Sequence, residues 1–220
     1  MIEFRGVSYA YDEEFVFKDI NFKINRGESV ALCGANGSGK STILKIINGI
    51  IFPTEGKYFF DGQEITKKIL DDNKFSKKFH QRVGFIWQNS DVQLFCGSVE
   101  EEISFGPRQM GLLDTEIKKR TEDAMEVLQL TKLKNRAPYT LSGGEKKKTA
   151  IASILTMNPE VWTLDEPLSA LDEKFKNWMT EFLLALKNAG KTILFSSHDS
   201  NFIEKIANRK FFLGENKNFF

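Results

Sequence analysis

Apolar residues follow several different spacings along this chain of 220 residues, and each spacing predicts a different kind of element. Apolar and polar positions alternate in Ile2–Tyr9 and again in Val16–Ile24, a pattern typical of antiparallel strands with one solvent-exposed face. Lys57–Gly62 is interpreted as a further strand that ends in a turn. Continuous apolar runs predict buried strands, and these runs are Ser29–Cys33, Arg82–Trp87, Val161–Leu164 and Thr192–Phe195.

Helices are predicted where apolar residues recur at helical intervals between these strands. The predicted helices are Ser41–Ile47, Asp114–Leu130 with Asp114 as its N-cap, Gly143–Met157, and a segment between Asp172 and Gly190. By contrast, Thr66–Lys78 is rich in lysine and weakly patterned, which favours a solvated surface loop. Strands and helices therefore alternate over most of the chain.

Composition excludes some classes of function. The chain holds 31 Lys and Arg residues against 30 Asp and Glu residues, so no nucleic acid bound by a broad basic face is expected. No apolar run reaches the roughly 18 residues that cross a bilayer, and no secretory signal opens the sequence. The two cysteines, Cys33 and Cys96, show neither the spacing of a disulfide framework nor that of a zinc site. We therefore expect a soluble cytosolic protein.

The segment Gly34–Ser41, GANGSGKS, matches the phosphate-binding loop pattern G-x-x-x-x-G-K-[ST]. It lies between a predicted buried strand and a predicted helix, which is the context that the pattern requires. Its glycines allow backbone N–H groups to approach phosphate oxygens, and the helix directs its positive end at the same anion. Lys40 would place its charge between the β- and γ-phosphates, and Ser41 would supply a hydroxyl ligand for Mg²⁺. The loop is predicted to bind a nucleoside triphosphate, as in kinases, GTPases and many ATPases.

These elements together predict an α/β fold: a P-loop NTPase core with a mainly parallel sheet, and an N-terminal antiparallel β part. The helix Asp114–Leu130 stands between strands of the nucleotide core, which indicates an inserted α-helical subdomain. We expect a single domain over residues 1–220. Within it, residues 1–88 and 159–220 would form the core, and residues 89–158 the helical subdomain.

Three further segments carry residue types suited to phosphate chemistry. Asp165 ends a buried strand, where its carboxylate can hold Mg²⁺, and Glu166 beside it can orient or deprotonate an attacking water. His198, which also follows a buried strand, can hydrogen-bond a γ-phosphate. The segment LSGGE, residues Leu141–Glu145, places a glycine pair at a helix start and so offers a second anion-binding terminus. These segments narrow the choice among nucleotide-binding enzymes.

With these segments, the chain resembles the ATP-binding-cassette (ABC) ATPases from Ile2 to about Leu213. GANGSGKS is similar to the Walker A loop of that family, VWTLDE to its Walker B strand and LSGGE to its signature motif. SALD is similar to the D-loop and SSHD to the segment of the switch histidine, and Gln88 stands at the Q-loop position. The signature motif is the most specific of these, because kinases and GTPases do not carry it.

The resemblance implies a role for residues of each motif. The implied catalytic residues are Glu166, His198 and Gln88. The implied ligands of Mg²⁺ are Ser41, Gln88 and Asp165. The residues expected to bind ATP are Tyr11, Asn36, Gly37, Ser38, Gly39, Lys40, Ser41, Thr42, Ser142, Gly143, Gly144 and Asp172. Among them, Tyr11 stands where the family places an aromatic ring against adenine.

The family works as a pair of cassettes that close head to tail around two ATP molecules, and the resemblance implies the same here. Lys40–Thr42 of one protomer would then face Ser142–Gly144 of the other, and Asp172 would cross the dimer. The signature serine and helix end would stabilise charge on the γ-phosphate from across the interface. Gln88 would touch Mg²⁺ and sense the transport partner. The implied partners are a second ABC ATPase subunit, identical or paralogous, and integral membrane transport subunits at the cytoplasmic face of the membrane.

A finer assignment rests on Gln88–Pro107, which contains QNSDVQLF and then VEEEISFGP. This segment resembles that of energy-coupling-factor and related cobalt or nickel importers, in which an acidic stretch follows Q-N-P-D-x-Q-L-F. Ser90 stands in place of the usual proline, and Glu145 replaces the more usual glutamine after the signature glycines. The implied function is that of an ATPase that drives import of a vitamin or a transition-metal ion.

Two alternatives stay open from the sequence. Within the same superfamily, the chain could energise an exporter or another class of importer. From a different class, it could be a soluble cassette that acts on ribosomes or DNA, although such proteins usually carry two cassettes or a long coiled-coil insertion. Lys40, Glu166 and His198 are all present, which disfavours a catalytically silent regulatory cassette.

Overall fold

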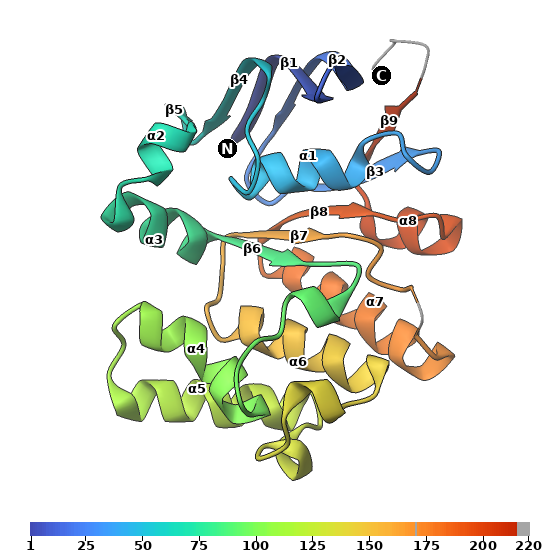
Figure 1. Ribbon diagram of the computed structural model, residues 1–220. Helices are drawn as coiled ribbons and strands as arrows, with labels where there is room; N and C mark the ends of the chain where they lie inside the picture. Colours follow the sequence, from blue (N-terminus) through green and yellow to red (C-terminus); the bar gives the residue numbers. More distant parts are fainter. Residues whose placement is uncertain (170, 215–220) are drawn as a thin grey trace.

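The computed structural model describes residues 1–169 and 171–214 and contains two β-sheets with helices packed against them (Figure 1). The first sheet is antiparallel, with strand order β2-β1-β4-β5. Its strands are β1 (Ile2–Tyr11), β2 (Glu14–Ile24), β4 (Glu55–Phe60) and β5 (Gln63–Glu64). The second sheet is parallel, with strand order β6-β7-β8-β3-β9. Its strands are β3 (Ser29–Gly34), β6 (Val83–Ile86), β7 (Val161–Leu164), β8 (Thr192–Ser196) and β9 (Arg209–Leu213).

The helices form layers around the parallel sheet (Figure 1). Helix α1 lies between the two sheets and shares a core with both, whereas α6, α7 and α8 cover the other face of the parallel sheet. Helices α4 and α5 pack beyond α6. The bounds are α1 (Lys40–Ile47), α2 (Lys67–Leu70), α3 (Asn73–Arg82), α4 (Val99–Gln109), α5 (Asp114–Val127), α6 (Gly143–Leu155), α7 (Glu173–Asn188) and α8 (Ser200–Ile206). Short 3-10 turns lie at Ser90–Val92, Thr131–Leu133 and Pro138–Thr140.

The central strand β3 shows why the parallel strands are apolar throughout. Val30 and Leu32 face the core that contains α1, whereas Ala31 and Cys33 face the core that contains α6 and α7. A parallel sheet has both faces covered, so successive side chains are buried on opposite sides. The predicted α/β fold, with its antiparallel N-terminal part and its helical insertion, is confirmed. The subdomain boundaries near residues 88 and 158 stay a prediction, because one core joins α4, α5 and α6 to the sheet.

The lysine-rich segment Thr66–Lys78, predicted to be a surface loop, is instead helical over most of its length. The Thr66 side chain accepts the N–H of Ile69 and so caps α2, and Asp72 accepts the N–H of Phe75 and caps α3. Four residues beyond Phe75, the ring of Phe79 is buried in the core that contains α1. The lysines occupy the exposed face of these helices. The prediction of a loop gave weight to the lysines and overlooked the two capping residues and the apolar stripe.

One other expectation differs from the structure, and some elements were not predicted. Asp114 is not the N-cap of its helix: Leu113 holds that position, and Asp114 is the first helical residue, where its charge still complements the helix dipole. The acidic run after Gln88 is the first turn of α4, which begins behind the capping side chain of Ser98. The sequence patterns also leave α8 and β9 unassigned. Among the described residues, no helix is both long and apolar enough to cross a membrane.

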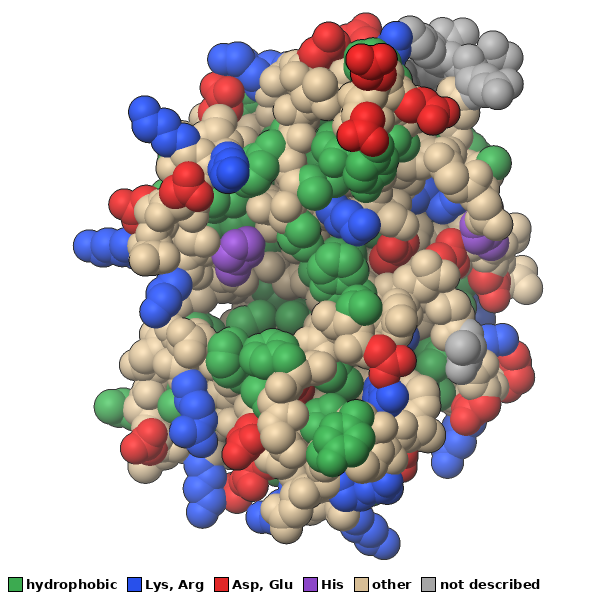
Figure 2. Space-filling view, in the orientation of Figure 1, with side chains coloured by type: hydrophobic (Ala, Val, Ile, Leu, Met, Phe, Trp, Pro, Cys, Tyr) green, Lys and Arg blue, Asp and Glu red, His purple; other side chains and the backbone are tan. Residues whose placement is uncertain are grey.

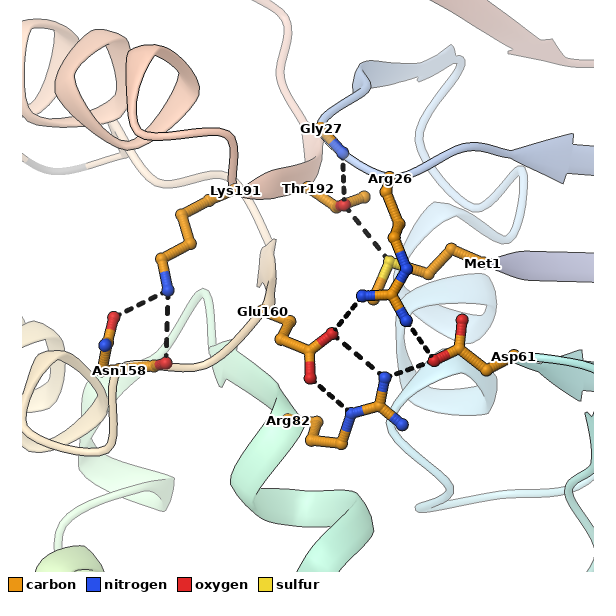
Figure 3. Close-up of polar contacts among 9 residues, drawn as sticks. All are labelled: Met1, Arg26, Gly27, Asp61, Arg82, Asn158, Glu160, Lys191 and Thr192. Carbon is orange, nitrogen blue, oxygen red and sulfur yellow. Dashed lines mark hydrogen bonds and ion pairs between the residues drawn. The ribbon is translucent and has the colours of Figure 1, made fainter.

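A four-residue ion network joins the two sheets at the amino ends of the parallel strands (Figure 3). Arg26 contacts Glu160 at 2.6 Å and Asp61 at 2.5 Å, and Arg82 contacts the same two carboxylates. The hydrogen bond from Arg82 lowers the pKa of Glu160 to about 2. Arg82 ends α3, and the other three residues come from three separate connections, so the network fixes the sheets against each other at the edge opposite the predicted site.

Candidate active site

The carboxyl ends of four parallel strands bring predicted nucleotide-binding residues to one edge of the sheet. Strand β3 leads into the phosphate loop, β6 into Gln88, β7 into Asp165 and Glu166, and β8 into the segment of His198. Ligands of open α/β sheets bind outside such strand ends. The cleft at this edge has a volume of about 760 Å³. It is lined by Tyr11, Val16, Asn36, Gly37, Gly39, Lys40, Ser41, Thr42, Gln88, Asp165, Glu166, Ser169 and His198.

Glycine is required at two positions of the phosphate loop. A Cβ on Gly34 would lie 2.4 Å from the carbonyl oxygen of Leu213, and Gly34 has φ +142°. A Cβ on Gly39 would lie 2.7 Å from the ring of Phe17, and Gly39 takes the left-handed conformation that caps α1. The loop can therefore follow this path only with glycine at both positions. This path places it at the N-terminal end of α1, where backbone N–H groups and the helix dipole favour an anion.

The loop presents groups that suit a phosphate. Lys40 is only 7% exposed, and its ammonium donates to the carbonyls of Gly34 at 2.9 Å and Ala35 at 2.8 Å, which holds the charge at the loop. The hydroxyl of Ser38 is buried without a hydrogen-bond partner. A buried hydroxyl without a partner is costly, so a ligand oxygen would satisfy it. The residues present therefore fit a bound nucleotide phosphate.

The two acids at the end of β7 are held by Ser196, to which the sequence analysis gave no role. Ser196, fully buried at the end of β8, donates its hydroxyl to Asp165 Oδ1 at 2.7 Å. The same hydroxyl accepts the backbone N–H of Glu166 at 2.8 Å. The available signals were its place directly after the predicted strand Thr192–Phe195 and at the start of the SSHD segment. Ser196 thus fixes the carboxylate of Asp165 and the backbone of Glu166 relative to the sheet.

Glu166 has the environment of a general base. Its backbone φ of +43° is uncommon for a residue other than glycine and directs the chain away from β7 into the cleft. Burial raises the pKa of its carboxyl, and the nearby charges of His198 and Lys40 oppose that rise. The imidazole Nε2 of His198 lies 3.4 Å from Glu166 Oε1, which is longer than most hydrogen bonds. The two side chains therefore face the same space beside the phosphate loop.

We expect Ser196→Ala to lower ATP turnover and stability together. The change leaves a buried carboxylate, Asp165, and the N–H of Glu166 without their partner, which costs about 1–3 kcal/mol. Urea unfolding would measure the stability and steady-state hydrolysis the turnover. Ser153→Ala is the matched control, because its hydroxyl bonds only the Ala150 carbonyl within α6. Wild-type turnover in Ser196→Ala would show that the positions of Asp165 and Glu166 do not depend on the Ser196 hydroxyl.

Tyr11 lines the same cleft as the phosphate loop. It ends β1, is 51% exposed and packs edge-to-face on Tyr9 with the ring centroids 5.0 Å apart. Val16, which the sequence patterns did not single out, lines the same cleft from β2. An exposed ring beside an aliphatic side chain suits a flat base. The antiparallel sheet therefore supplies a wall of the cleft that adjoins the phosphate loop.

Oxygen atoms suited to a magnesium ion meet in this cleft. Ser41 comes from the first turn of α1, Gln88 from the end of β6, and Asp165 from the end of β7. A hydroxyl, an amide oxygen and a carboxylate are the hard ligands that Mg²⁺ takes beside phosphate oxygens. The donor set therefore fits the ion that the motif implies.

The signature residues do not join this cleft. Ser142, Gly144 and Asp172 line a second cleft of about 530 Å³ on α6 and α7, and Gly143 is the first residue of α6. Ser142 caps α6 in a capping box with Glu145, and Asp172 accepts the N–H of Phe175 and caps α7. Ser169 of the SALD segment lines the first cleft, and residue 170 lies outside the described residues. One chain therefore holds two separated sets of predicted nucleotide-binding residues.

The sheet, the glycine loop and the paired acids define a P-loop nucleoside triphosphatase. The family model described as ABC transporter matches residues 17–169, more than half of the chain. The chain belongs to the ABC transporter family and is an ATPase of that family.

Known relatives and solved structures agree with this membership. The nickel import ATP-binding protein LarO of Lactiplantibacillus plantarum is 42% identical over 95% of this chain and 87% of its own. The energy-coupling factor transporter ATP-binding protein EcfA of Methanothermobacter thermautotrophicus is 42% identical over 97% of this chain and 68% of its own. A solved dimeric ATP-binding cassette, bound to ADP and Pi in a post-hydrolysis state, superposes with a TM-score of 0.88. It is 30% identical and covers 100% of this chain and 98% of its own.

Proposed function

We propose that this protein is the ATPase subunit of an energy-coupling-factor importer, which drives uptake of a vitamin or a transition-metal ion through separate membrane subunits. It would lie on the cytoplasmic face of the membrane. The observation that carries the ATPase mechanism is the separation of the two sets of residues: one cleft holds the phosphate loop and the acids, and the signature residues stand outside it. Support for import comes from the similarity to LarO and EcfA.

In the proposed reaction, residues of the first cleft prepare water for attack on the γ-phosphate. Glu166 orients the water and accepts its proton, and its raised pKa suits that role. Lys40 follows β3 and His198 follows the neighbouring strand β8, and both would bring positive or hydrogen-bonding groups to the phosphate. Bound Mg²⁺ would neutralise charge on the phosphate oxygens, and Ser41, Gln88 and Asp165 are the residues that would hold it.

The second cleft, which Ser142 lines, would bind the nucleotide held by the partner subunit. Ser142 and the first N–H groups of α6 face outward at a helix N-terminus, where they can donate to an anion. In the closed dimer, these donors would meet the γ-phosphate bound by the other protomer. Each ATP would therefore be enclosed only when two cassettes close, and its hydrolysis would release them.

An apolar groove lined by Gln93, five residues after Gln88, fits a segment of the membrane subunits. The groove, about 390 Å³, lies between α3 and α4, and Figure 2 shows it as a hollow edged by hydrophobic side chains. Phe95, 68% exposed, and Phe105, 40% exposed, stack edge-to-face beside it. Gln93, also in its lining, bonds the backbone of Phe85 and Trp87. A membrane-subunit segment that binds here would contact Gln93, whose side chain anchors the backbone just before Gln88.

Phe95→Ser should weaken attachment to the membrane subunits at least about tenfold, because a large exposed ring at the centre of an interface contributes most of its binding energy. The measurement is co-purification of the membrane subunits with the tagged variant. Phe212→Ser is the matched control, since Phe212 is 61% exposed on β9, away from the groove. If the Phe95 variant retains its partners as fully as the control does, the groove is not the docking site.

The test of the function as a whole is to isolate the protein from membranes and to identify the integral subunits that come with it. Uptake of radiolabelled nickel, cobalt and vitamins by vesicles holding that complex, with and without ATP, would then define the substrate class. Recovery with ribosomes or DNA and without a membrane protein would contradict the proposal.

A further inference from the structure

A buried lysine of the signature helix contacts the loop that carries Gln88. Lys147 is 3% exposed and lies in the second turn of α6. Its ammonium donates to the carbonyl oxygens of Trp87 and Gln88, both at 2.8 Å. Burial lowers the pKa of Lys147 to about 8, and the charge of Asp165 opposes that decrease. A lysine is seldom so buried unless its charge has partners.

The two carbonyls that Lys147 contacts have no partner in the sheet. The pairing of β6 with β7 ends at Ile86 and Leu164, so the next two residues leave the ladder. Both bonds from Lys147 are partly shielded from water, and a carbonyl outside the ladder is satisfied there by a side-chain donor. The ammonium of Lys147 is the donor for both Trp87 and Gln88. The path of the chain through the Gln88 position therefore depends on a side chain from α6.

Other contacts connect the same loop, but none replaces this one. The side chain of Gln93 bonds the Phe85 carbonyl and the Trp87 N–H, both at 3.2 Å, which anchors the loop to itself. Lys146 contacts Asp91 at 2.5 Å, three residues beyond Gln88. The contact from Lys147 alone joins the backbone of Gln88 to the helix whose first turn carries the signature.

We propose that Lys147 is a positioning residue that ties Gln88, in the cleft for this chain's own nucleotide, to Ser142, the group offered to the partner's nucleotide. The inference rests on the proposed shared site. Lys147 stands five residues after Ser142 on one rigid helix, and its ammonium holds the Gln88 backbone. A shift of α6 during closure would therefore move Gln88 with it. Each chain would thus couple the two nucleotide sites of the dimer.

The test compares Lys147→Met, which removes the donor at similar length, with Lys187→Met. Lys187 is the matched control because its ammonium also bonds a backbone carbonyl, that of Ile206 at 2.9 Å, but between α7 and α8. We expect Lys147→Met to lower kcat for ATP hydrolysis about tenfold with KM within about twofold, since the phosphate loop is intact. The control should retain both values.

A double-mutant cycle separates positioning from general destabilisation. Gln88→Ala keeps the carbonyl that Lys147 contacts and removes only the side chain. If Lys147 acts through Gln88, adding Lys147→Met to Gln88→Ala should lower kcat by less than about twofold. If the double variant instead loses kcat by the product of the two single losses, the inference is overturned. If Lys147→Met does not fold, Lys147→Gln, which retains an N–H donor, takes its place in the same cycle.

A readout independent of turnover is amide hydrogen exchange in the peptide that spans residues 87–93. Exchange there should accelerate in Lys147→Met and stay at the wild-type rate in Lys187→Met. Unchanged exchange together with unchanged kcat would overturn the inference and leave the proposed function standing. If instead Gln88→Ala hydrolyses ATP at the wild-type rate, the assignment of Gln88 is wrong, and the inference falls with it.

Discussion

Glu166→Gln is expected to lower ATP turnover by about 10²–10⁴-fold, the usual contribution of a general base, while the protein still binds ATP. Glutamine has the same shape but cannot accept the proton of the attacking water. The backbone N–H of residue 166 keeps its bond to Ser196, so the geometry of the strand end is preserved. Lys40 and the rest of the phosphate loop are untouched. The measurement is single-turnover hydrolysis beside equilibrium binding of labelled ATP.

The same variant should also accumulate as an ATP-bound dimer. If the γ-phosphate holds two cassettes together, a chain that binds ATP without cleaving it stays in the closed state. Analytical ultracentrifugation with Mg²⁺ and ATP would detect this dimer. Glu122→Gln is the control, because Glu122 is an exposed carboxylate of α5 outside both clefts. Parental turnover in Glu166→Gln would show that Glu166 is not the base.

Ser142→Arg is expected to lower hydrolysis by at least about 100-fold, the loss typical when a donor to developing charge is removed. The long side chain would also obstruct the approach of the partner's nucleotide. Because Ser142 lines a different cleft from Lys40, the affinity of the isolated protomer for ATP should stay within about twofold of wild type. Isothermal titration of the monomer and steady-state hydrolysis would measure the two effects.

The control for this second prediction adds the same charge elsewhere. Asn188→Arg places an arginine at the exposed C-terminal end of α7, where a positive charge is tolerated by the helix dipole. It should hydrolyse ATP as the wild type does. Equal hydrolysis by Ser142→Arg would contradict a site shared between two chains.

The phosphate loop and the two acids could be identified from sequence because their chemistry depends on local spacing. Gly34–Ser41 places its glycines, lysine and serine within eight consecutive positions, and Asp165 directly follows an apolar run. The role of Ser196 was missed because a serine after a strand is common, and in the SSHD segment only His198 was given a role. Its role depends on β8 lying beside β7, which brings its hydroxyl to Asp165.

Tertiary packing also determined the structure of two lysine-rich segments that composition did not predict. The lysines of Thr66–Lys78 suggested a solvated loop, yet Phe79 is buried and two helices form around side-chain caps. Lys147 is the middle one of three consecutive lysines, and its burial follows from the position of α6 against the end of β6. A lysine in the sequence does not by itself predict an exposed position, because its long side chain can be buried while its ammonium reaches a backbone carbonyl of a neighbouring element.

The sequence by itself determined that this chain binds nucleoside triphosphate and belongs with the ABC ATPases, because each motif needs only neighbouring residues and the element that carries it. The tertiary structure decided which of these residues share a cleft. Parallel strands β3, β6, β7 and β8 end at one edge, so the phosphate loop meets Gln88 and both acids there. Ser142 begins a helix on the other side of the sheet and opens onto a different cleft. That separation is set by long-range packing, which no local pattern encodes.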